Sequence, residues 1–326
     1  MWISGYIDIK QFETAIMNIA IINYPHALQS PVYGLYELFE MANSLCAPAK
    51  AIHCQMLTLD QLVGDAGPKP NAGAAGGYDY VILPPAIKDD FYLNPSSALL
   101  NWLKDQHHKK ARLCSACSGA FILAKAGLLD QRTATTHWGL VQKFKQAFPL
   151  VPLNSHKILI NDGDVITAGG VMSWLDLGLE IVALHAGPSV MVQLGKHLVV
   201  DTGYRAQSYY EQFNPRFDHG DEGILNAQTF LDEHYHAKFK MAELAAMGHM
   251  SERSFLRRFQ QGTGFKPTEY IQRLRIQKAC DQLERSKKSF DAIALEVGYE
   301  DSSACRKVFV RVMGLTPKAF RQRFVR

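Results

Sequence analysis

The stretch "RLCSACSGAFILAKAGLL", residues 112–129, places a strand-like segment directly before a helix-like one, with cysteine at the junction. We expect Cys114 to lie within the strand, Cys117 to lie on the turn, and Gly119 to begin the helix. Small residues on both sides of Cys117 suit a tight turn that presents one side chain at the end of a strand. The stretch therefore predicts the strand–elbow–helix unit of an α/β domain.

The sequence around this elbow alternates between strand-like and helix-like segments. Buried strands are predicted for "NIAIINY" (18–24), "IHCQMLTL" (52–59) and "YDYVILPP" (78–85), and helices for residues 31–46, 98–109 and 172–187. Residues 157–170 instead read as a hairpin about Asp162-Gly163. Strands that alternate with helices predict a parallel sheet covered on both faces, in a flavodoxin-like sandwich.

The polar stretch 202–223 contains Gly and Pro and ends this alternation. We place an N-terminal domain at residues 17–205, a linker at 206–223, and an all-α domain at 224–326. The strand pattern begins at Met17, so residues 1–16 are expected to be an extension outside the fold, from a start codon placed too early.

The first sixteen residues are charged and lack an apolar core, so they do not resemble a signal peptide. No apolar run in the sequence is long enough to span a bilayer, and we expect no membrane partner. The chain has six cysteines. Without secretion, we expect them to be reduced thiols in the cytoplasm.

Charge is distributed unevenly along the chain. Residues 224–326 contain 19 Lys and Arg against 11 Asp and Glu, whereas the rest of the chain contains 16 against 20. A basic region joined to a mildly acidic body suggests a module that binds a polyanion such as nucleic acid.

The basic region contains an internal repeat of fifty residues. The repeat aligns Gly248 with Gly298, Phe259 with Phe309, Gly264 with Gly314, Pro267 with Pro317, and Tyr270 with Phe320. Each copy reads as a short helix, a turn, a capping residue (Ser251 or Asp301) and a second helix. This order is typical of a helix-turn-helix, here present twice.

The second helix of each copy has an aromatic or small apolar face and a polar face. At about 100° per residue, Phe255 and Phe259 share the inward face of the first copy, as Cys305 and Phe309 do in the second. The predicted DNA-binding residues are Arg253, Ser254, Leu256, Arg257 and Gln260 in the first copy, and Ser303, Arg306 and Lys307 in the second.

Two interpretations of these faces remain open, a helical bundle with a solvated basic surface or a pair of DNA recognition helices. Arginine can bind guanine edges or phosphates, and the connecting helix could hold two such units about one turn of duplex apart. The duplicated pattern together with the local positive charge favours DNA recognition.

Residues 224–326 resemble the AraC-type DNA-binding domain, a tandem helix-turn-helix unit. The resemblance rests on residues 230–279 and on "IALEVGYEDSS" and "FVRVMGLTPKAFRQRF" in the second half. The family usually has Phe where Cys305 stands and Arg where Lys307 stands. The resemblance therefore implies a looser second recognition helix that contacts phosphates more than bases.

Several readings of the two elbow cysteines can be compared. A structural zinc site needs four ligands, and the other cysteines (Cys46, Cys54, Cys280, Cys305) form no second closely spaced pair, so we expect no metal. A redox pair is disfavoured because Cys114 and Cys117 lie on opposite sides of the strand–turn boundary. Backbone N–H groups at the start of the helix would lower the pKa of a nucleophilic thiol at Cys117.

Residues 17–200 resemble the PfpI-like, class I glutamine-amidotransferase-like fold, in the version fused to AraC domains in GlxA-family transcriptional regulators. The matching stretches are "ACSGAFILAKAGLLDQRTATTHW", "ITAGGVMSWLDLGLEIV" and "AGPSVMVQLGKHLVV". Enzymes of this fold commonly place His after the nucleophile and an acidic residue against the thiol. Here Ser118 follows Cys117 and Pro31 stands at the acidic position, so the resemblance implies a domain that is not catalytic.

These features together predict a sequence-specific transcriptional regulator without a cofactor, more often an activator by analogy with its family. The predicted ligand-binding residues are Cys117, Ser118, Gly119, His137 and Trp138, with Thr136 nearby. Helix N–H groups suit a carboxylate and Trp138 suits a quaternary ammonium, so we expect an amino acid or betaine-like effector. The expected partners are double-stranded promoter DNA, this effector, a second copy of the chain and, for an activator, RNA polymerase.

Two alternatives to a ligand-sensing transcriptional regulator remain open. The first is a cysteine-dependent amidohydrolase or aldehyde-handling enzyme that uses Cys117. The second is a DNA-binding protein whose N-terminal domain only dimerises.

Overall fold

The computed structural model describes residues 16–62, 77–203 and 205–325. The predicted N-terminal extension lies outside these residues, apart from Ile16. The chain divides into two compact units between Gln207 and Ser208, each described below by itself. Within the described part of the chain, no helix is both long and apolar enough to cross a membrane.

The first unit is built on a six-stranded sheet with the order β2-β1-β3-β4-β6-β5. The strands are β1 (Met17–Asn23), β2 (Ile52–Thr58), β3 (Tyr80–Leu83), β4 (Arg112–Ala116), β5 (Leu159–Asn161) and β6 (Val165–Ala168). Neighbouring strands are parallel, except that β5 and β6 pair antiparallel as a hairpin about residues 162–163. The sheet and the hairpin are both as predicted.

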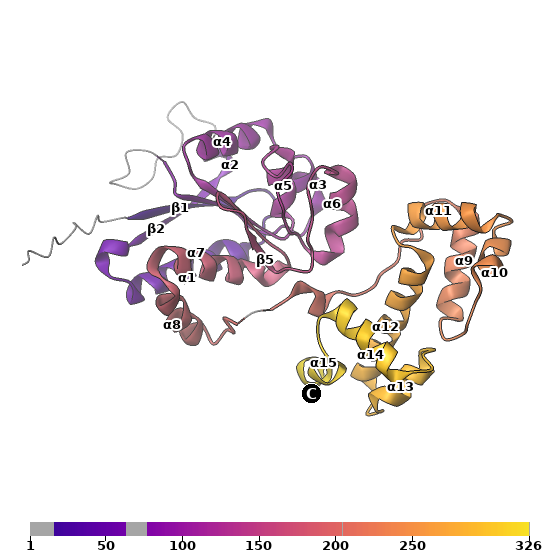
Figure 1. Ribbon diagram of the computed structural model, residues 1–326. Helices are drawn as coiled ribbons and strands as arrows, with labels where there is room; N and C mark the ends of the chain where they lie inside the picture. Colours follow the sequence, from indigo (N-terminus) through magenta and orange to yellow (C-terminus); the bar gives the residue numbers. More distant parts are fainter. Residues whose placement is uncertain (1–15, 63–76, 204, 326) are drawn as a thin grey trace, which may run out of the picture. The chain divides into compact units, whose positions relative to one another are not determined.

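Helices cover both faces of the sheet (Figure 1). One face packs against α1 (Gln29–Leu45) and α7 (Trp174–Ala186), with α8 (Pro188–Leu198) packed on these two helices. The other face packs against α2 (Leu59–Leu62), α4 (Ser97–His108) and α5 (Gly119–Lys125), with α3 (Asp89–Leu93) packed on α5. The helix α6 (Val141–Ala147) and the 3-10 turns η1 (Pro48–Lys50), η2 (Trp138–Leu140) and η3 (Val171–Ser173) complete the described elements of this unit, and the 3-10 turn η4 (Gln207–Tyr210) spans the boundary. This is the predicted flavodoxin-like sandwich.

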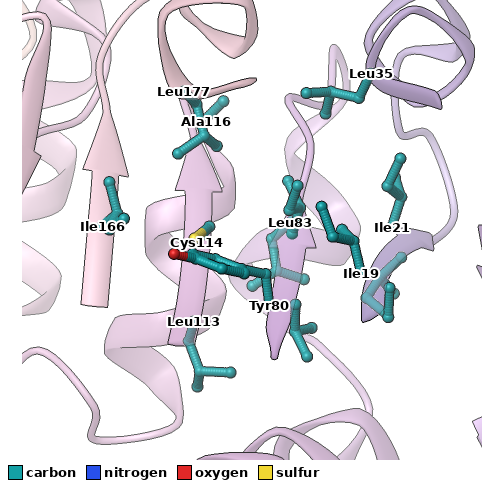
Figure 2. Packing of buried hydrophobic residues seen from close by; sticks show 14 of the residues in the cluster. Ile19, Ile21, Leu35, Tyr80, Leu83, Leu113, Cys114, Ala116, Ile166 and Leu177 are labelled. Carbon is teal, nitrogen blue, oxygen red and sulfur yellow. The ribbon is translucent and has the colours of Figure 1, made fainter. Parts of the chain in front are cut away.

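The core of this unit lies on the central strands, which are buried on both faces. Figure 2 shows Ile19 on β1, Tyr80 on β3 and Cys114 on β4 beside one another, with Leu35 of α1 and Leu177 of α7 packed on the sheet. Every residue of β3 and β6, and every residue of β1 but the last, is buried, as is typical of parallel strands covered on both faces.

The regular elements in the described residues of the second unit are all helices. It consists of α9 (Glu222–Glu233), α10 (Met241–Met247), α11 (Glu252–Thr263), α12 (Pro267–Arg285), α13 (Phe290–Glu296), α14 (Ser302–Met313) and α15 (Pro317–Phe324). The pairs α10–α11 and α13–α14 are the two predicted helix-turn-helix units. Gly264 and Gly314 end α11 and α14 at φ +81° and +72°, a conformation that favours glycine.

Residues before α9 also pack within this second unit. The ring of Phe213 makes edge contacts with those of Phe265 and Tyr270, and its backbone N–H donates to Gln277 at 2.9 Å. Tyr210 makes an edge contact with Phe324 of α15. Part of the segment assigned to the linker at the sequence level therefore makes specific contacts with the helices that follow it.

Candidate nucleic-acid interface and ligand site

The first helix-turn-helix presents α11 as its outward helix. Ser251 caps this helix by accepting a hydrogen bond from the N–H of Ser254, as a serine at this position is expected to do. Phe255 and Phe259 are fully buried with ring centroids 5.3 Å apart, and the ring of Phe259 meets that of Tyr270 edge-on. The predicted rotation of the helix is confirmed.

The opposite face of α11 is exposed and basic. Arg253, Arg257 and Gln260 are exposed, and Leu256 is 42% exposed between them. Ser254 is half-buried, with its hydroxyl 3.2 Å from that of Ser251. Among the described residues, neither Arg253 nor Arg257 takes part in an ion pair. Both guanidinium groups are therefore available to phosphates or to guanine edges.

The second helix-turn-helix repeats this arrangement with different side chains. Asp301 caps α14 by accepting hydrogen bonds from the N–H groups of Ser303 at 2.8 Å and Ala304 at 3.2 Å. Cys305 and Phe309 are fully buried, as predicted, while Ser303, Arg306 and Lys307 are exposed. The fold thus places all three predicted side chains on the outward face.

Arg306 is held by its neighbours. Its Nη2 lies 3.4 Å from Asp291 Oδ1, and its guanidinium stacks 4.9 Å from the ring centroid of Phe290. Asp291 therefore competes with DNA phosphates for the guanidinium of Arg306. Lys307 has no ion pair among the described residues and is a point charge suited to phosphate.

The elbow of the first unit has the predicted strand–turn–helix form. Cys117 lies between β4 and α5 at φ +55°, a conformation that non-glycine residues adopt rarely. A Cβ at Gly119 would lie 2.5 Å from the carbonyl oxygen of Leu83, so only glycine allows α5 to pack this closely against β3.

The thiol of Cys117 is not activated, which corrects one expectation. The residue is only 4% exposed, and this burial raises the pKa of the Cys117 thiol to about 12, despite a hydrogen bond from the backbone of Ser118. Loss of solvation of the thiolate outweighs the stabilisation expected from the start of the helix. Pro31 is itself buried in the first turn of α1, where it offers no carboxylate.

Ser118 and Thr136 tie the elbow to its surroundings. The buried Ser118 hydroxyl accepts a hydrogen bond from the N–H of Ala86 at 2.8 Å and donates to the Ala86 carbonyl at 3.3 Å. The Thr136 hydroxyl donates to the carbonyl of Cys117 at 2.7 Å. The structure therefore brings Thr136, and with it the start of the "THW" segment, against the elbow.

His137 and Trp138 follow directly and are half-buried, with ring centroids 5.1 Å apart. Nδ1 of His137 accepts a hydrogen bond from the N–H of Gly139 at 3.0 Å, and burial lowers the pKa of His137. The imidazole is therefore neutral at pH 7. The pair forms an aromatic surface next to the elbow.

Gln207 holds this aromatic segment in place, and sequence reasoning missed it. Its side chain is buried, accepts the N–H of Trp138 at 2.8 Å, and donates to the carbonyls of Ser155 at 2.8 Å and Thr136 at 3.1 Å. These partners are about 50 to 70 residues away in sequence, so no local pattern signals the contact.

Both units match known protein families. Residues 56–184 match the DJ-1/PfpI family, and residues 244–323 match a family described as a helix-turn-helix domain. This chain joins a DJ-1/PfpI domain to an AraC-type helix-turn-helix domain. The two resemblances seen in the sequence are confirmed.

Several relatives of the chain are regulators. It is 27% identical over 207 residues to the HTH-type transcriptional regulator CdhR of Pseudomonas aeruginosa, which covers 63% of this chain and 61% of that protein. It is 28% identical over 216 residues to the HTH-type transcriptional regulator GlxA of Rhizobium meliloti, which covers 65% of each. The matches thus span less than two thirds of the length of either relative.

A solved structure of the first domain's family is also similar. The chain aligns with Drosophila melanogaster DJ-1beta at a TM-score of 0.46 and 17% identity, over 57% of this chain and 99% of that one.

Proposed function

We propose that this protein is a DNA-binding transcriptional regulator whose DJ-1/PfpI domain senses a small metabolite. The observation that carries the proposal is the exposed face of α11, where Arg253 and Arg257 have no ion-pair partner among the described residues and lie opposite the buried pair Phe255 and Phe259. A rigid helix that offers free guanidinium groups in a helix-turn-helix is suited to the major groove. The named regulators among its relatives support this reading.

In this proposal α11 and α14 enter successive segments of one face of the duplex. Arg253, Ser254, Leu256, Arg257 and Gln260 of α11 contact bases and phosphates, and Ser303, Arg306 and Lys307 of α14 make the second set of contacts. A second copy of the chain would double the number of phosphate contacts. As an activator, the protein would in addition contact RNA polymerase. We place this activity in the cytoplasm.

The DJ-1/PfpI domain acts in this proposal as a sensor and not as an enzyme. The raised pKa of Cys117 leaves its thiol protonated at neutral pH, and Pro31 supplies no acid. The half-buried His137 and Trp138 form the accessible wall of the ligand site in this proposal. The predicted residues Cys117, Ser118 and Gly119 are buried and support that wall through Thr136. An aromatic wall and a neutral imidazole suit an amino acid or betaine-like effector.

DNA binding is tested by titrating the full chain against a random pool of labelled duplex, followed by enrichment and sequencing. We expect an enriched site to be bound at least about 1,000-fold more tightly than random duplex, and the affinity to fall steeply with salt. Equal affinity for both duplexes at every salt concentration would exclude a sequence-specific regulator.

Sensing is tested by the thermal unfolding of the full chain with amino acids, betaines, polyamines and small aldehydes, for the wild type and Cys117→Ala. A compound that stabilises both proteins and is recovered unchanged supports a sensor. A compound consumed by the wild type alone would instead identify a cysteine enzyme. Stabilisation by none of them, with intact DNA binding, would favour a domain that only dimerises.

A further inference from the structure

The DNA-binding unit has two separate hydrophobic cores, one for each helix-turn-helix. The first surrounds Phe255 and Phe259 and includes Leu274 of α12, and the second surrounds Phe309 and includes Ile276 of the same helix. Each recognition helix is therefore packed on its own cluster, and the two clusters share the helix α12 and the half-buried Tyr235, which packs against both. The angle between the recognition helices depends on the contacts that join the clusters.

Arg275 lies between these two clusters, at the one position of α12 that separates Leu274 from Ile276. Its guanidinium donates to the carbonyl of Tyr235 at 2.7 Å and to that of Ala237 at 2.8 Å. Both carbonyls belong to the loop between α9 and α10, which leads directly into the first helix-turn-helix.

The same guanidinium also reaches the second helix-turn-helix. It donates to the carbonyl of Gly298 at 2.9 Å, in the turn between α13 and α14, and lies 5.5 Å from the ring centroid of Tyr299. The planar fork of an arginine is suited to holding several carbonyls in a fixed geometry, and hydrogen bonds from a charged donor are stronger than neutral ones. The side chain of Arg275 thus joins the loop before the first helix-turn-helix to the turn of the second by hydrogen bonds to backbone carbonyls.

The backbones of the loop before α10 and of the turn before α14 approach each other closely. A Cβ at Gly298 would lie 2.4 Å from the carbonyl oxygen of His236, and Gly298 has φ +90°. In the first helix-turn-helix the matching glycine, Gly248, instead packs against Gly223 of α9. The backbone of the loop of residues 235–237 therefore packs against the turn of the second helix-turn-helix, as the backbone of α9 packs against the turn of the first.

We propose that Arg275 is the positioning residue that fixes the separation of the two recognition helices, so that the protein recognises two DNA elements at one spacing. This inference rests on the proposed function, because it requires both helices to contact one duplex. Arg275 itself contacts no DNA in this account. It acts by holding the turn before α14 against the loop before α10.

The test compares the full wild-type chain with Arg275→Met and Arg275→Lys in enrichment of random duplex DNA. We expect the wild type to enrich two elements about one helical turn apart at a single spacing. For Arg275→Met we expect the same two elements at several spacings, and about tenfold weaker binding to the wild-type site. Its affinity for a duplex that carries only the first element stays unchanged.

Lys238→Met is the matched control. Lys238 also joins the loop before α10 to the second helix-turn-helix, through Glu300, but it does so in an exposed ion pair. We expect it to keep the wild-type spacing. A single spacing and wild-type affinity in Arg275→Met would overturn the inference. If that variant does not fold by circular dichroism, Arg275→Lys decides, since it keeps the charge but cannot hold carbonyls on both sides at once.

Failure of the proposed function gives a different result from failure of this inference. A wild-type chain that enriches no sequence shows that the protein is not a sequence-specific DNA binder. A wild-type chain that enriches two elements at variable spacing shows that it binds DNA but that Arg275 does not set the geometry.

Discussion

Helices α11 and α14 are matched residue for residue by the fifty-residue repeat, but they offer different side chains to solvent. Arg253 and Arg257 of α11 correspond to Ser303 and Lys307 of α14. Leu256 in turn corresponds to Arg306, which is already engaged by Asp291 and Phe290. Within the described part of the chain, the outward face of α11 therefore presents two guanidinium groups outside any ion pair, and that of α14 presents one paired guanidinium and one ammonium. This difference suggests base reading by α11 and backbone contacts by α14.

The inward faces of the two helices are expected to be equally important for stability, which sets the largest predicted effect. Phe259→Ala and Phe309→Ala should each destabilise the DNA-binding unit by about 3–5 kcal/mol, because both rings are fully buried. Urea unfolding followed by circular dichroism measures the loss. An unchanged midpoint for either variant would mean that its helix is rotated from the position described.

The outward faces should differ in what they contribute to DNA binding. Arg257→Ala is expected to cost about 1–3 kcal/mol on an enriched site and much less on random duplex, as a base-reading arginine does. Lys307→Ala should weaken binding to both duplexes equally and reduce the salt slope by about 1. Fluorescence anisotropy over a range of salt concentrations measures both. The reverse pattern would assign base reading to α14.

The ion pair between Arg306 and Asp291 predicts a smaller effect, in which DNA binding becomes tighter instead of weaker. Asp291→Ala removes the carboxylate that holds Arg306 and should tighten DNA binding by about twofold, since exposed ion pairs are worth less than about 1 kcal/mol. Glu296→Ala is the control, because it removes the same charge from α13 but breaks an ion pair with Lys288 instead of the one with Arg306. Equal gains in the two variants would show that only the net charge matters.

The first helix-turn-helix has an acid-sensitive contact with α9 that has no counterpart at the matching position of the second, which predicts the smallest effect. Asp221 of α9 accepts two hydrogen bonds from Arg258, which hold the pKa of its carboxyl below the usual value, whereas Val308 takes the place of Arg258 in α14. A lowered carboxyl pKa contributes stability above pH about 4 that is lost as the pH falls through the folded value.

We therefore expect the stability of the DNA-binding unit to fall more between pH 5 and pH 3 in the wild type than in Arg258→Val. Unfolding midpoints at these pH values measure the difference. An equal fall in both proteins would show that the pair between Asp221 and Arg258 does not contribute.

Local patterns in the sequence were enough to predict the elements and their faces. The period of 3.6 residues placed Phe255 and Phe259 inside, the caps Ser251 and Asp301 marked where helices begin, and small residues beside Cys117 marked the elbow. Each of these features depends on neighbours within four positions, which the sequence displays directly.

Contacts between distant segments could not be predicted in the same way. Gln207 and Arg275 look like ordinary polar residues in the sequence, yet each joins backbone segments 23 to 71 residues away. The raised pKa of Cys117 likewise depends on how deeply the finished fold buries the turn, which outweighs the local effect of the helix start. Candidate DNA contacts were therefore easier to find than the residues that position them.

The most direct test of the unequal helices is the affinity of the full chain for an enriched duplex in which each base pair is replaced in turn. The account predicts losses of about 1–3 kcal/mol at base pairs in the element that Arg253 and Arg257 contact, and much smaller losses in the element contacted by α14. Equal losses in both elements, or no loss at any base pair, would contradict it.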